Sequence, residues 1–443
     1  MLAELARVEE VLNSRWPETK IEPSLDRIAH LMTLLGDPQL SYPVIHITGT
    51  NGKSSTARMV EALLRARGLN TGLVTSPHLH SITERIQLNG EPISPSKFVE
   101  AYDELEPYMA VVDAESINSD GPAMSYFEAL TGMAFAVFAD APVDVAVIEV
   151  GMGGRWDATN VVQPDVAVIT PVGLDHMEYL GDTIEAIATE KAGIIKQGCI
   201  AVIAQQQPEA AEVLLRRAVE VDAPVLREGI EFGVVDRSMA IGGQVVTLHG
   251  ITGDYSDIVL SLYGAHQASN ASVALAAVEA FFGANERLND ENVHSAFGSV
   301  KSPGRLEIVR RSPTVIVDAA HNPHGAAVLA SALEESFDFE NIIGVVSIMA
   351  DKDVDGVLAA FEATFNQVVI TNNGAPRAMD ADELASHAEV IFGGDRIVVE
   401  PNLADAIARA VDLADAAGTA GVGVVITGSV VTAGVARALV GRA

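Results

Sequence analysis

Residues 44–64 read VIHITGTNGKSSTARMVEALL, and this stretch decides the fold of the first part of the chain. Its apolar beginning predicts a buried strand that ends near Thr48. The later part carries apolar residues at the spacing of an amphipathic helix, which we expect over Ser55–Arg67. A strand, a glycine-rich turn and a helix in this order predict a parallel sheet flanked by helices.

The turn between this strand and helix has the composition of a phosphate-binding loop. Gly49 and Gly52 allow a tight backbone turn that exposes amide groups to an anion. Lys53 adds a mobile positive charge, Ser54 and Ser55 add hydroxyls, and the positive end of the helix dipole lies at the same place. This is the arrangement of a shortened P-loop, and it predicts binding of nucleotide phosphates. A glycine-rich turn without a ligand is the alternative.

Strand and helix patterns alternate over most of the chain, which predicts an α/β fold. The strand candidates are short apolar runs with almost no polar alternation, as expected for strands buried on both faces of a parallel sheet. They are YPVIHIT, DVAVIEV, DVAVIT, CIAVIA, TVIVDAA, IIGVVSI, QVVIT, RIVVE and GVVIT. Two further helices are expected over Asp182–Lys196 and His324–Phe337.

Some segments depart from this alternation. Residues 227–262 contain short strands and turn signals and predict an antiparallel patch, and RIQLNGEPIS predicts a hairpin that turns at Asn89–Gly90. The strongest boundary signal is KSPGR, Lys301–Arg305, because Pro and Gly stand together there and a new strand–helix series follows. We therefore expect a P-loop domain with a mostly parallel sheet over residues 1–300, and a smaller Rossmann-like α/β domain over residues 301–443.

The composition limits the classes of partner. The 443 residues include 28 Lys and Arg against 60 Asp and Glu, a formal net charge of −32. Such a field repels phosphate backbones and anionic lipid, so we expect no nucleic-acid partner and no membrane partner. An anionic small molecule would need local cations or metal ions to overcome the same field. The one cysteine, Cys199, excludes an internal disulfide and a cysteine-rich zinc site, and we expect it in the core.

Neither end of the chain carries a targeting or membrane signal. The N-terminal stretch MLAELARVEEVLNSRW mixes acidic residues into an amphipathic pattern, unlike a signal peptide. Residues 416–436 lack charge and are long enough to span a bilayer, but they contain five glycines and no Leu or Phe. We interpret them as a strand, a turn and a helix, and expect a soluble cytoplasmic protein.

Polar side chains interrupt or follow the predicted buried strands, where α/β sheets place their sites. Glu149 ends an apolar strand in DVAVIEVGMGGRWDATN, where an unpaired carboxylate would be costly. A magnesium ion would explain it, since Mg²⁺ prefers oxygen ligands, and a salt bridge, for example to Arg155, is the alternative. Asp175 and His176 follow the next strand and Ser76 follows another, which makes His176 and Ser76 candidate ligands. A structural histidine and a turn serine are the alternatives there.

Nine motifs together resemble the folylpolyglutamate synthase and dihydrofolate synthase family, whose close relatives are the Mur ligases. They are GTNGKSS, TSPHLHSITER, SYFEALT, EVGMGGRWDATN, GLDHMEYLG, EKAGI, HQASNA, PGRLE and DAAHNP, and their order and spacing match over nearly the whole chain. The resemblance implies that residues 1–300 are an ATP-binding domain like the central domain of Mur ligases. It implies a glutamate-ligase domain over residues 301–443.

The resemblance also implies which residues bind ATP and metal. The ATP contacts would be Gly49, Thr50, Asn51, Gly52, Lys53, Ser54, Ser55, Asn270, Arg305 and Asp318. Ser76 and Glu149 would bind one Mg²⁺, and His176 would bind a second, helped by Lys191 carrying a carbamate. That modification turns a cation into a carboxylate suited to a metal, whereas spacing alone gives Lys191 no special role. Lys53, Lys191 and His176 would be the catalytic residues.

Substrate contacts follow from the same resemblance. They would be Ser125, Trp156, Asp157 and Ala158 for the pterin substrate, His321 and Ser429 for glutamate, and Arg85 as a further substrate contact. The segment Lys20–Gly36, before the loop, is a further candidate for shaping the pterin pocket. Two residues depart from the family pattern: Trp156 stands where an aliphatic residue is frequent, and Ser54 replaces a common glycine. Neither departure removes a charge-bearing group.

The implied reaction is the ATP-dependent addition of L-glutamate to dihydropteroate and to reduced folates. ATP would convert a carboxylate into an acyl phosphate, with Lys53 and Mg²⁺ stabilising the transferring group. The amine of L-glutamate would then attack and release phosphate. Closure of two hinged domains would keep water from the acyl phosphate, and Arg305, beside the hinge, would couple closure to ATP binding.

Three alternatives fit the residues less well. A Mur-type amino-acid ligase would carry a domain for a uridine-nucleotide substrate before the loop, which begins here at Gly49. A Ras-like nucleotide switch would carry NKxD, and ADKD at Ala350 lacks the asparagine. A dinucleotide oxidoreductase would carry GxGxxG after a strand, and no predicted strand is followed by it.

Several properties stay open at this level. Folylpolyglutamate synthesis without dihydrofolate synthesis is an alternative to the bifunctional interpretation. The length of the glutamate tail, a role for a monovalent cation and the oligomeric state are not encoded in a readable motif, and a monomer is the expectation.

Overall fold

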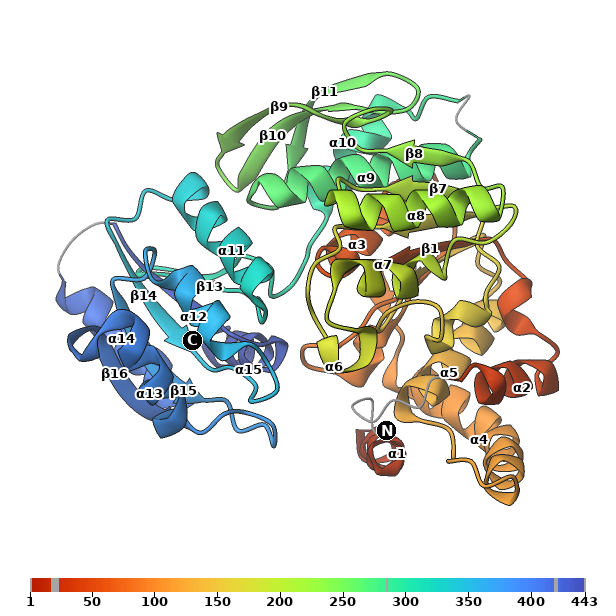
Figure 1. The fold of residues 1–443 in the computed structure, drawn as a ribbon, viewed down its shortest axis with the longest axis horizontal. Helices are drawn as coiled ribbons and strands as arrows, with labels where there is room; N and C mark the ends of the chain where they lie inside the picture. The colour runs from red at the N-terminus through yellow and green to blue at the C-terminus, as the bar shows by residue number, and fades with distance from the viewer. Residues whose placement is uncertain (1, 17–23, 284–285, 418–420, 442–443) are drawn as a thin grey trace. The chain divides into compact units, whose positions relative to one another are not determined.

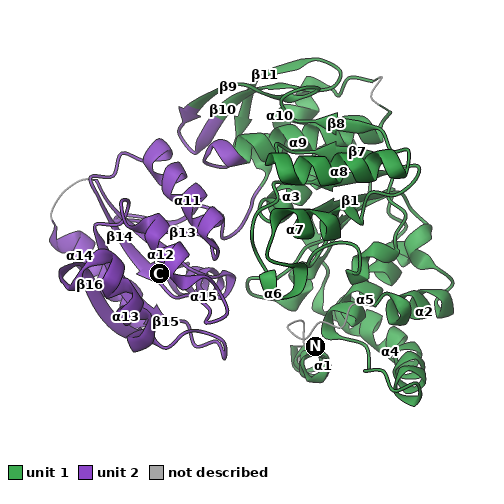
Figure 2. Ribbon diagram, in the orientation of Figure 1, with its two compact units in different colours: residues 1–238, 245–261, 267–300 green, residues 239–244, 262–266, 301–443 purple. Residues whose placement is uncertain are grey.

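The computed structural model describes residues 2–16, 24–283, 286–417 and 421–441. Residues 20–23 of the predicted pocket segment and residues 418–420 of the uncharged stretch lie outside them. The chain divides into two compact units, coloured separately in Figure 2. Unit 1 comprises residues 1–238, 245–261 and 267–300, and unit 2 comprises residues 239–244, 262–266 and 301–443.

Unit 1 is built on an eight-stranded sheet with the order β4-β3-β2-β5-β1-β6-β7-β8. Figure 1 labels β1, β7 and β8 of this sheet. Its strands are β1 Val44–Thr48, β2 Thr71–Val74, β3 Ile86–Leu88, β4 Glu91–Pro92, β5 Val145–Glu149, β6 Val166–Ile169, β7 Ile200–Ile203 and β8 Val225–Arg227. All neighbouring pairs from β2 to β8 are parallel, and β3 and β4 add antiparallel pairs at one edge. The predicted α/β fold with a mostly parallel sheet is confirmed.

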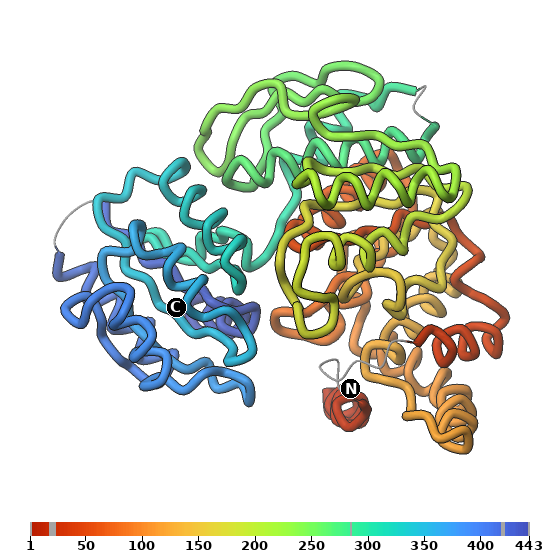
Figure 3. The backbone as a smooth tube through the Cα atoms, in the orientation of Figure 1, coloured from red at the N-terminus to blue at the C-terminus, as the bar shows by residue number. Residues whose placement is uncertain are grey.

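The central strands are buried along their whole length. Every residue of β1 and of β5 is buried, as expected where helices cover a parallel sheet. In β1, Ile47 lies beside Glu149 of β5 and Val168 of β6. Segments about a hundred residues apart are therefore neighbours, and the chain between them can be followed by its colour in Figure 3. The carboxyl ends of these strands meet at one edge of the sheet, where most of the candidate site residues follow them.

Helices connect the strands of unit 1. They are α1 Leu2–Ser14, α2 Asp26–Leu34, α3 Lys53–Ala66, α4 Pro95–Asn118, α5 Tyr126–Asp140, α6 Met177–Leu180, α7 Ile184–Ala192, α8 Pro208–Glu220, α9 Ala265–Phe281 and α10 Asp290–Ser299, with 3₁₀ turns η1 Pro38–Leu40, η2 Ile82–Arg85 and η3 Ala158–Val161. The first two residues of α9 belong to unit 2.

Two of these helices correct the sequence prediction. Helix α3 begins at Lys53 rather than Ser55, because Gly52, with φ of 87°, already serves as its N-cap. Helix α7 is shorter than Asp182–Lys196. The Thr183 hydroxyl accepts a hydrogen bond from the backbone N–H of Ala186 and caps its start, and Gly193 follows its last residue.

The two departures from strand–helix alternation are seen as separate features. The β3–β4 hairpin turns at Asn89 and Gly90, whose φ values of 53° and 80° are those of a type I′ turn, as predicted. Within residues 227–262, β9 Gly233–Ala240, β10 Gly243–His249 and β11 Asp254–Leu260 form their own sheet in the order β11-β10-β9.

Unit 2 is built on a six-stranded sheet with the order β12-β13-β17-β14-β15-β16. Its strands are β12 Glu307–Arg311, β13 Thr314–Val317, β14 Asn341–Val346, β15 Gln367–Asn372, β16 Ile397–Asn402 and β17 Val422–Thr427. Strand β12 is antiparallel to β13, and the other neighbours are parallel. Because the last strand inserts between β13 and β14, the winding direction reverses there, and open α/β sheets bind ligands at such a point.

The helices of unit 2 follow its strands in turn. They are α11 Pro323–Ser336, α12 Val354–Phe361, α13 Ala381–Phe392, α14 Leu403–Ala416 and α15 Val430–Val440, with the 3₁₀ turn η4 Gly394–Arg396. The uncharged stretch thus contains β17 and the start of α15, as predicted, and none of the described helices has the length and apolar character to cross a membrane. In unit 1, Cys199 is a free, buried core residue, which confirms its prediction.

Candidate active site

The phosphate loop runs from the end of β1 to the start of α3, and two of its positions require glycine. A β-carbon on Gly49 would collide with the hydroxyl of Thr170, which follows β6. On Gly52 it would lie 2.6 Å from Oδ1 of Asn270 in α9. The loop is thus packed between the end of β6 and α9, and the predicted ATP contact Asn270 lies directly against it.

Hydrogen bonds to the β6–α6 connection also hold the phosphate loop in place. Thr170 Oγ1 donates to the backbone oxygen of Asn51 at 2.7 Å, and Thr50 Oγ1 donates to the backbone oxygen of Gly173 at 2.9 Å. The N–H of Gly173 donates back to the Thr50 hydroxyl. These bonds fix the carbonyl side of the loop and preorganise its backbone for an anion.

Two lysines converge on one carbonyl oxygen of this loop. Lys53 Nζ donates to the backbone oxygens of Gly49 and Thr50, each at 3.1 Å. Lys191 Nζ, from α7, donates to the same Gly49 oxygen at 2.7 Å. Burial, together with the positive charge of Lys53, lowers the pKa of Lys191 to about 7, although the charges of Asp175 and Asp157 oppose the shift. A neutral amine is therefore readily formed at Lys191 near physiological pH.

Glu149 ends β5 beside this loop, and the residue is only 1% exposed. The hydroxyl of Ser54 donates to Oε1 at 2.7 Å, and the backbone N–H of Ser76 donates to Oε2 at 3.1 Å. The structure thus brings Ser54, Ser76 and Glu149 together in unit 1. Oxygen atoms of a buried carboxylate and of two serines are the donor chemistry that Mg²⁺ prefers, so these residues fit that ion.

The second predicted metal ligand has a different setting. His176 caps the short helix α6 in a left-handed conformation, with φ of 51°, and its Nε2 lies 3.8 Å from Oδ2 of Asp175. Within the described ranges, no group of three or more His, Cys, Asp or Glu side chains could hold a metal. The expected magnesium sites contain only two such residues, Glu149 and His176. Substrate phosphates and water would have to complete them, as is usual for Mg²⁺.

The predicted substrate contacts Ser125 and Arg85 come from two elements: Arg85 ends η2, and Ser125 lies at the start of α5. Ser125 caps this helix, and with Glu128 it forms a capping box: the Ser125 N–H donates to the Glu128 carboxylate at 2.7 Å, and the Glu128 N–H donates to the Ser125 hydroxyl at 3.1 Å. The Arg85 guanidinium lies 5.2 Å from the centroid of the Tyr126 ring, and its Nε donates to His78 Nδ1 at 2.9 Å. Burial lowers the pKa of His78 to about 4, so its ring is a neutral acceptor.

The remaining acceptor candidates lie on the loop after β5. Trp156 is partly buried against the core that contains Leu180, and Ala158 begins η3. Asp157 is turned into its own loop: one oxygen accepts from the Met152 N–H at 2.9 Å, and the other accepts from the N–H and hydroxyl of Thr159. Its carboxylate thus shapes the loop, and burial raises its pKa.

The candidates of unit 2 lie at the carboxyl end of its sheet. Asp318 follows β13, and its two oxygens accept the backbone N–H groups of Leu306 and Ala320. Burial raises the Asp318 pKa, and the positive charge of Arg305 opposes that shift, so the two predicted ATP contacts are neighbours. His321 hydrogen-bonds through Nδ1 to the backbone oxygen of Ala319.

Ser429, the second glutamate candidate, follows β17 and is buried as the N-cap of α15. Its hydroxyl accepts from the backbone N–H of Thr432 at 3.0 Å and from the side-chain amide of Asn373 at 3.2 Å. The contacts with ATP and glutamate that we expect in this unit stay predictions.

Sequence reasoning missed several residues that build the site. Thr170 and Gln267 support the loop from outside its motif, since Gln267 donates to Ser55 Oγ at 3.3 Å and accepts from Asn270. No local pattern marks them. His46 did carry a signal, because a histidine inside an apolar strand requires a partner, and its ring is bonded to Thr159.

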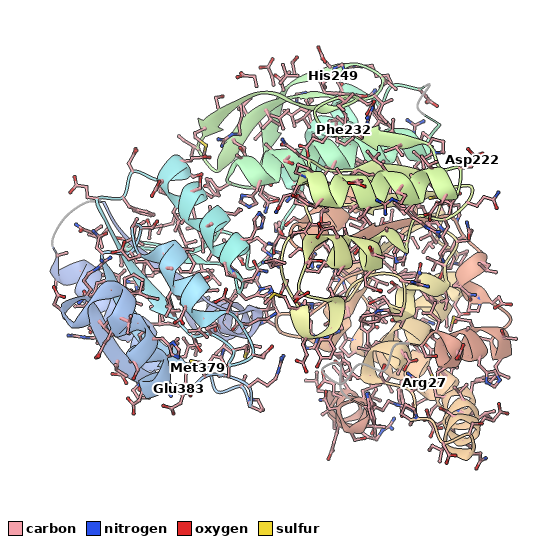
Figure 4. The ribbon with its side chains drawn as sticks, in the orientation of Figure 1. Arg27, Asp222, Phe232, His249, Met379 and Glu383 are labelled. Carbon is pink, nitrogen blue, oxygen red and sulfur yellow. The ribbon has the colours of Figure 1, made fainter. Side chains whose placement is uncertain are left out.

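One buried ion pair ties the start of α5 to α2, where Figure 4 labels Arg27. Arg27 Nε donates to both oxygens of Glu128, at 3.1 and 3.2 Å, and the two side chains are 11% and 5% exposed. We expect Arg27→Met to lower the free energy of unfolding by about 3 kcal/mol, because it leaves the Glu128 charge buried without its cation. Urea denaturation monitored by circular dichroism measures the loss.

The chain offers a matched control for this pair. Arg65 Nε donates to one oxygen of the buried Glu61 at 3.1 Å, but the Arg65 side chain is 45% exposed. Arg65→Met should therefore cost less, about 1 kcal/mol. Equal losses in the two variants would contradict the role assigned to burial of the Arg27–Glu128 pair.

Comparison with known protein families gives two matches along this chain. The model of the Mur ligase middle domain matches residues 47–278, and the model of the Mur ligase glutamate ligase domain matches residues 304–430.

Individual proteins match over longer ranges. The dihydrofolate synthase/folylpolyglutamate synthase of Mycobacterium tuberculosis is 56% identical, over 100% of this chain and 95% of its own length. The protein of the same name from Escherichia coli is 32% identical, over 83% of this chain and 82% of its own.

Solved structures agree with these sequence matches. The M. tuberculosis folylpolyglutamate synthase complexed with ADP superposes with a TM-score of 0.96 at 55% identity, covering 100% of this chain and 99% of that one. The E. coli FolC protein in complex with DHPP and ADP superposes with a TM-score of 0.85 at 30% identity, covering 98% and 97%.

Proposed function

This chain belongs to the Mur ligase family, in its dihydrofolate synthase/folylpolyglutamate synthase branch, and from that membership we infer that it is an ATP-dependent glutamate ligase. It joins L-glutamate to dihydropteroate, giving dihydrofolate, and it adds further glutamates to folates. The observation that carries this inference is the phosphate loop with Lys53, placed beside the buried Glu149 carboxylate that Ser54 and Ser76 hold.

The chemistry can be assigned to residues of this chain. A carboxylate is a poor electrophile, so the acceptor carboxylate attacks the γ-phosphorus of ATP and becomes an acyl phosphate as ADP leaves. Lys53 and the amides of Gly49–Gly52 stabilise the charge on the phosphoryl group in transfer. The neutral amine of L-glutamate then attacks the acyl carbon, and inorganic phosphate leaves with the electron pair of the broken C–O bond. The nitrogen loses one proton, which the departing phosphate takes up, and the amide is formed.

We propose that Ser54, Ser76 and Glu149 hold one magnesium ion and that His176 contributes to a second. Bound Mg²⁺ would supply positive charge at the phosphate oxygens. A carbamate on Lys191 is supported by its chemistry, because only the neutral amine reacts with CO₂, and this amine is buried with a pKa of about 7. We keep ATP contacts from Asn270, Arg305 and Asp318, and glutamate contacts from His321 and Ser429, as parts of the same proposal.

Glu149→Gln tests the proposed metal site. The amide keeps the shape and one acceptor oxygen but removes the charge, so we expect the Mg²⁺ concentration for half-maximal activity to rise about tenfold or more. Titration of activity with Mg²⁺ at saturating ATP measures this. An unchanged Mg²⁺ requirement together with unchanged turnover would show that Glu149 is not a ligand of the proposed metal site.

Mass analysis of products tests the function as a whole. ATP and L-glutamate are supplied with dihydropteroate in one assay and with a folate monoglutamate in another. We expect dihydrofolate in the first assay, folate diglutamate or longer products in the second, and one ADP for each amide formed. Product in the second assay alone would establish the alternative, a folylpolyglutamate synthase without dihydrofolate synthase activity.

The broader assignments extend this proposal. We propose that residues 1–300 act as the ATP-binding domain and residues 301–443 as the glutamate-ligase domain. A monomeric state and a cytoplasmic location stay predictions. Size-exclusion chromatography coupled to light scattering tests the first, and fractionation of the source cells tests the second.

A further inference from the structure

A chain of buried polar side chains adjoins residues 150–158, called here the acceptor loop because acceptor contacts are predicted at Trp156, Asp157 and Ala158. Its members are His46 in β1, Thr159 in η3 and Asp157 at the end of the loop after β5. His46 and Thr159 are fully buried, and Asp157 is 4% exposed. Their side chains are joined in series: His46 Nε2 lies 2.8 Å from Thr159 Oγ1, which lies 2.5 Å from Asp157 Oδ1.

With Asp157 ionised, the form that the backbone N–H groups bonded to both of its oxygens favour, the hydrogen-bond partners assign the protons along this chain. The Thr159 hydroxyl hydrogen is donated to Asp157, so the Thr159 oxygen is left as an acceptor. His46 must then donate through Nε2–H, which leaves Nδ1 as a bare lone pair. Nδ1 is buried and makes no hydrogen bond to the described residues. Burial and the positive charge of Lys196 lower the pKa of His46 to about 3, in agreement with a neutral ring.

This arrangement is costly for packing alone. A buried nitrogen without a partner loses its hydration and gains nothing in return, and a leucine of similar volume would avoid the loss. What the histidine provides is a donor that holds the Thr159 hydroxyl with its hydrogen directed at Asp157. The backbone N–H groups of Thr159 and Met152 also donate to Asp157. These hydrogen bonds to the Asp157 carboxylate, called here the Asp157 staple, hold the loop in one conformation.

A second hydrogen bond, from Thr48, also connects the acceptor loop to β1. Thr48 lies two residues after His46 on the same strand, so the two side chains point to the same face of the sheet. Thr48 Oγ1 donates to the backbone oxygen of Gly153 at 2.6 Å. The strand that leads into the phosphate loop therefore holds the acceptor loop at both its middle and its end.

We propose that His46 is a positioning residue for the acceptor: through Thr159 and Asp157 it sets the conformation of residues 150–158 relative to the phosphate loop. This proposal rests on the proposed function, and it takes from the sequence analysis the prediction that Trp156 and Ala158 contact the acceptor. His46 itself touches no substrate. Its removal loosens the acceptor site without changing how the phosphate loop holds ATP.

Two substitutions at His46 separate positioning from packing. His46→Leu keeps the volume and removes the donor, whereas His46→Gln places an amide N–H near the position of Nε2. We expect His46→Leu to raise the KM for dihydropteroate about tenfold, with the KM for ATP within about twofold of wild type. His46→Gln should restore the acceptor KM to within about threefold of wild type.

A matched control and a double variant complete the kinetic test. Tyr42→Phe removes another buried hydrogen bond just before β1, from the Tyr42 hydroxyl to the backbone oxygen of Phe135, and should leave the acceptor KM unchanged. In His46→Leu combined with Thr159→Val, the two effects on the acceptor KM should not add, because both break one chain. Additive effects would overturn the proposal, as would equal acceptor KM values in the Leu and Gln variants.

A measurement without turnover keeps this proposal separate from the proposed function. Hydrogen exchange at the amides of Met152 and Thr159 reports whether the Asp157 staple is closed. Faster exchange at both amides in His46→Leu, but not in His46→Gln, supports the positioning role even if no glutamate ligase activity is found. Unchanged exchange in His46→Leu would overturn it, even with full activity in the wild type.

Discussion

Lys53→Ala should abolish most of the activity, with kcat/KM for ATP falling about a thousandfold or more. The lysine lies at the first position of α3 and reaches back over the loop, where Nζ donates to the carbonyls of Gly49 and Thr50. Those contacts keep the ammonium beside the loop amides, where a phosphoryl group would bind. Removing it leaves the loop intact but takes away the positive charge that meets the transferring group.

The measurement combines steady-state kinetics with equilibrium binding of a non-hydrolysable ATP analogue. Lys97→Ala is the matched control, because Lys97 also lies in the first turn of a helix of unit 1, near Glu100 and Asp140. It should keep wild-type kinetics. If Lys53→Ala bound the analogue as tightly as wild type and formed product at full rate, the phosphate loop would not be the ATP site and the proposed function would fail.

Lys191→Met should reduce turnover to a similar extent, about a thousandfold, if a carbamate on this lysine takes part in the reaction. The wild type should lose activity in buffers stripped of CO₂ and regain it with bicarbonate, whereas the variant should not respond. The wild-type response should also weaken as the pH falls below about 7, since the protonated amine cannot react with CO₂. Lys196→Met is the control, because Lys196 is a partly buried lysine that also has a lowered pKa, of about 8, and its Nζ donates to the backbone oxygens of Asn160 and Val162.

The same substitution has a stability signature of defined sign. The folded pKa of Lys191 lies below that of a free lysine, near 10.4, so the unfolded chain binds the extra proton between about pH 7 and pH 10. The Lys191 contribution to the free energy of unfolding therefore rises with pH across that window and is least favourable below it. Lys191→Met should remove this slope and be more stable than wild type at pH 6.5 in urea denaturation. An unchanged slope, together with an unchanged CO₂ response, would return Lys191 to an ordinary structural role.

Much of the fold could be predicted because its strands are uninterrupted apolar runs. VIHIT, VAVIE and VAVI are strands buried throughout, and a parallel sheet then follows from the helices between them. The phosphate loop was readable for a similar reason, since two glycines, a lysine and two hydroxyls stand together in sequence. The start of α3 was placed two residues late because Gly52 caps the helix through its backbone conformation, which the sequence pattern does not separate from the loop itself.

The supports of the site could not be predicted, because they come from distant segments. Ser125 and Glu128 form a capping box, which the S-x-x-E spacing in SYFE indicates. The cation that Glu128 binds is Arg27, 101 residues away, and no local pattern indicates it. Thr170 lies against Gly49 from the end of another strand. Asp157 could be named from a motif, but only the folded loop shows that its carboxylate faces inward. Residues 239–244 and 262–266 belong to unit 2, although the residues between and around them belong to unit 1, and no sequence pattern indicates this either.

The one cysteine of this chain, Cys199, can report local unfolding of the part of unit 1 that buries it. Cys199 is fully buried directly before β7, in the core that also contains residues of α7. Burial also raises its pKa, so both lack of access and a low thiolate fraction protect it from alkylating reagents. A fluorescent maleimide would label it only when that part of unit 1 opens. Labelling rates with and without bound nucleotide would therefore measure local opening around α7, the helix that carries Lys191. The measurement needs no engineered cysteine, and no second cysteine adds background.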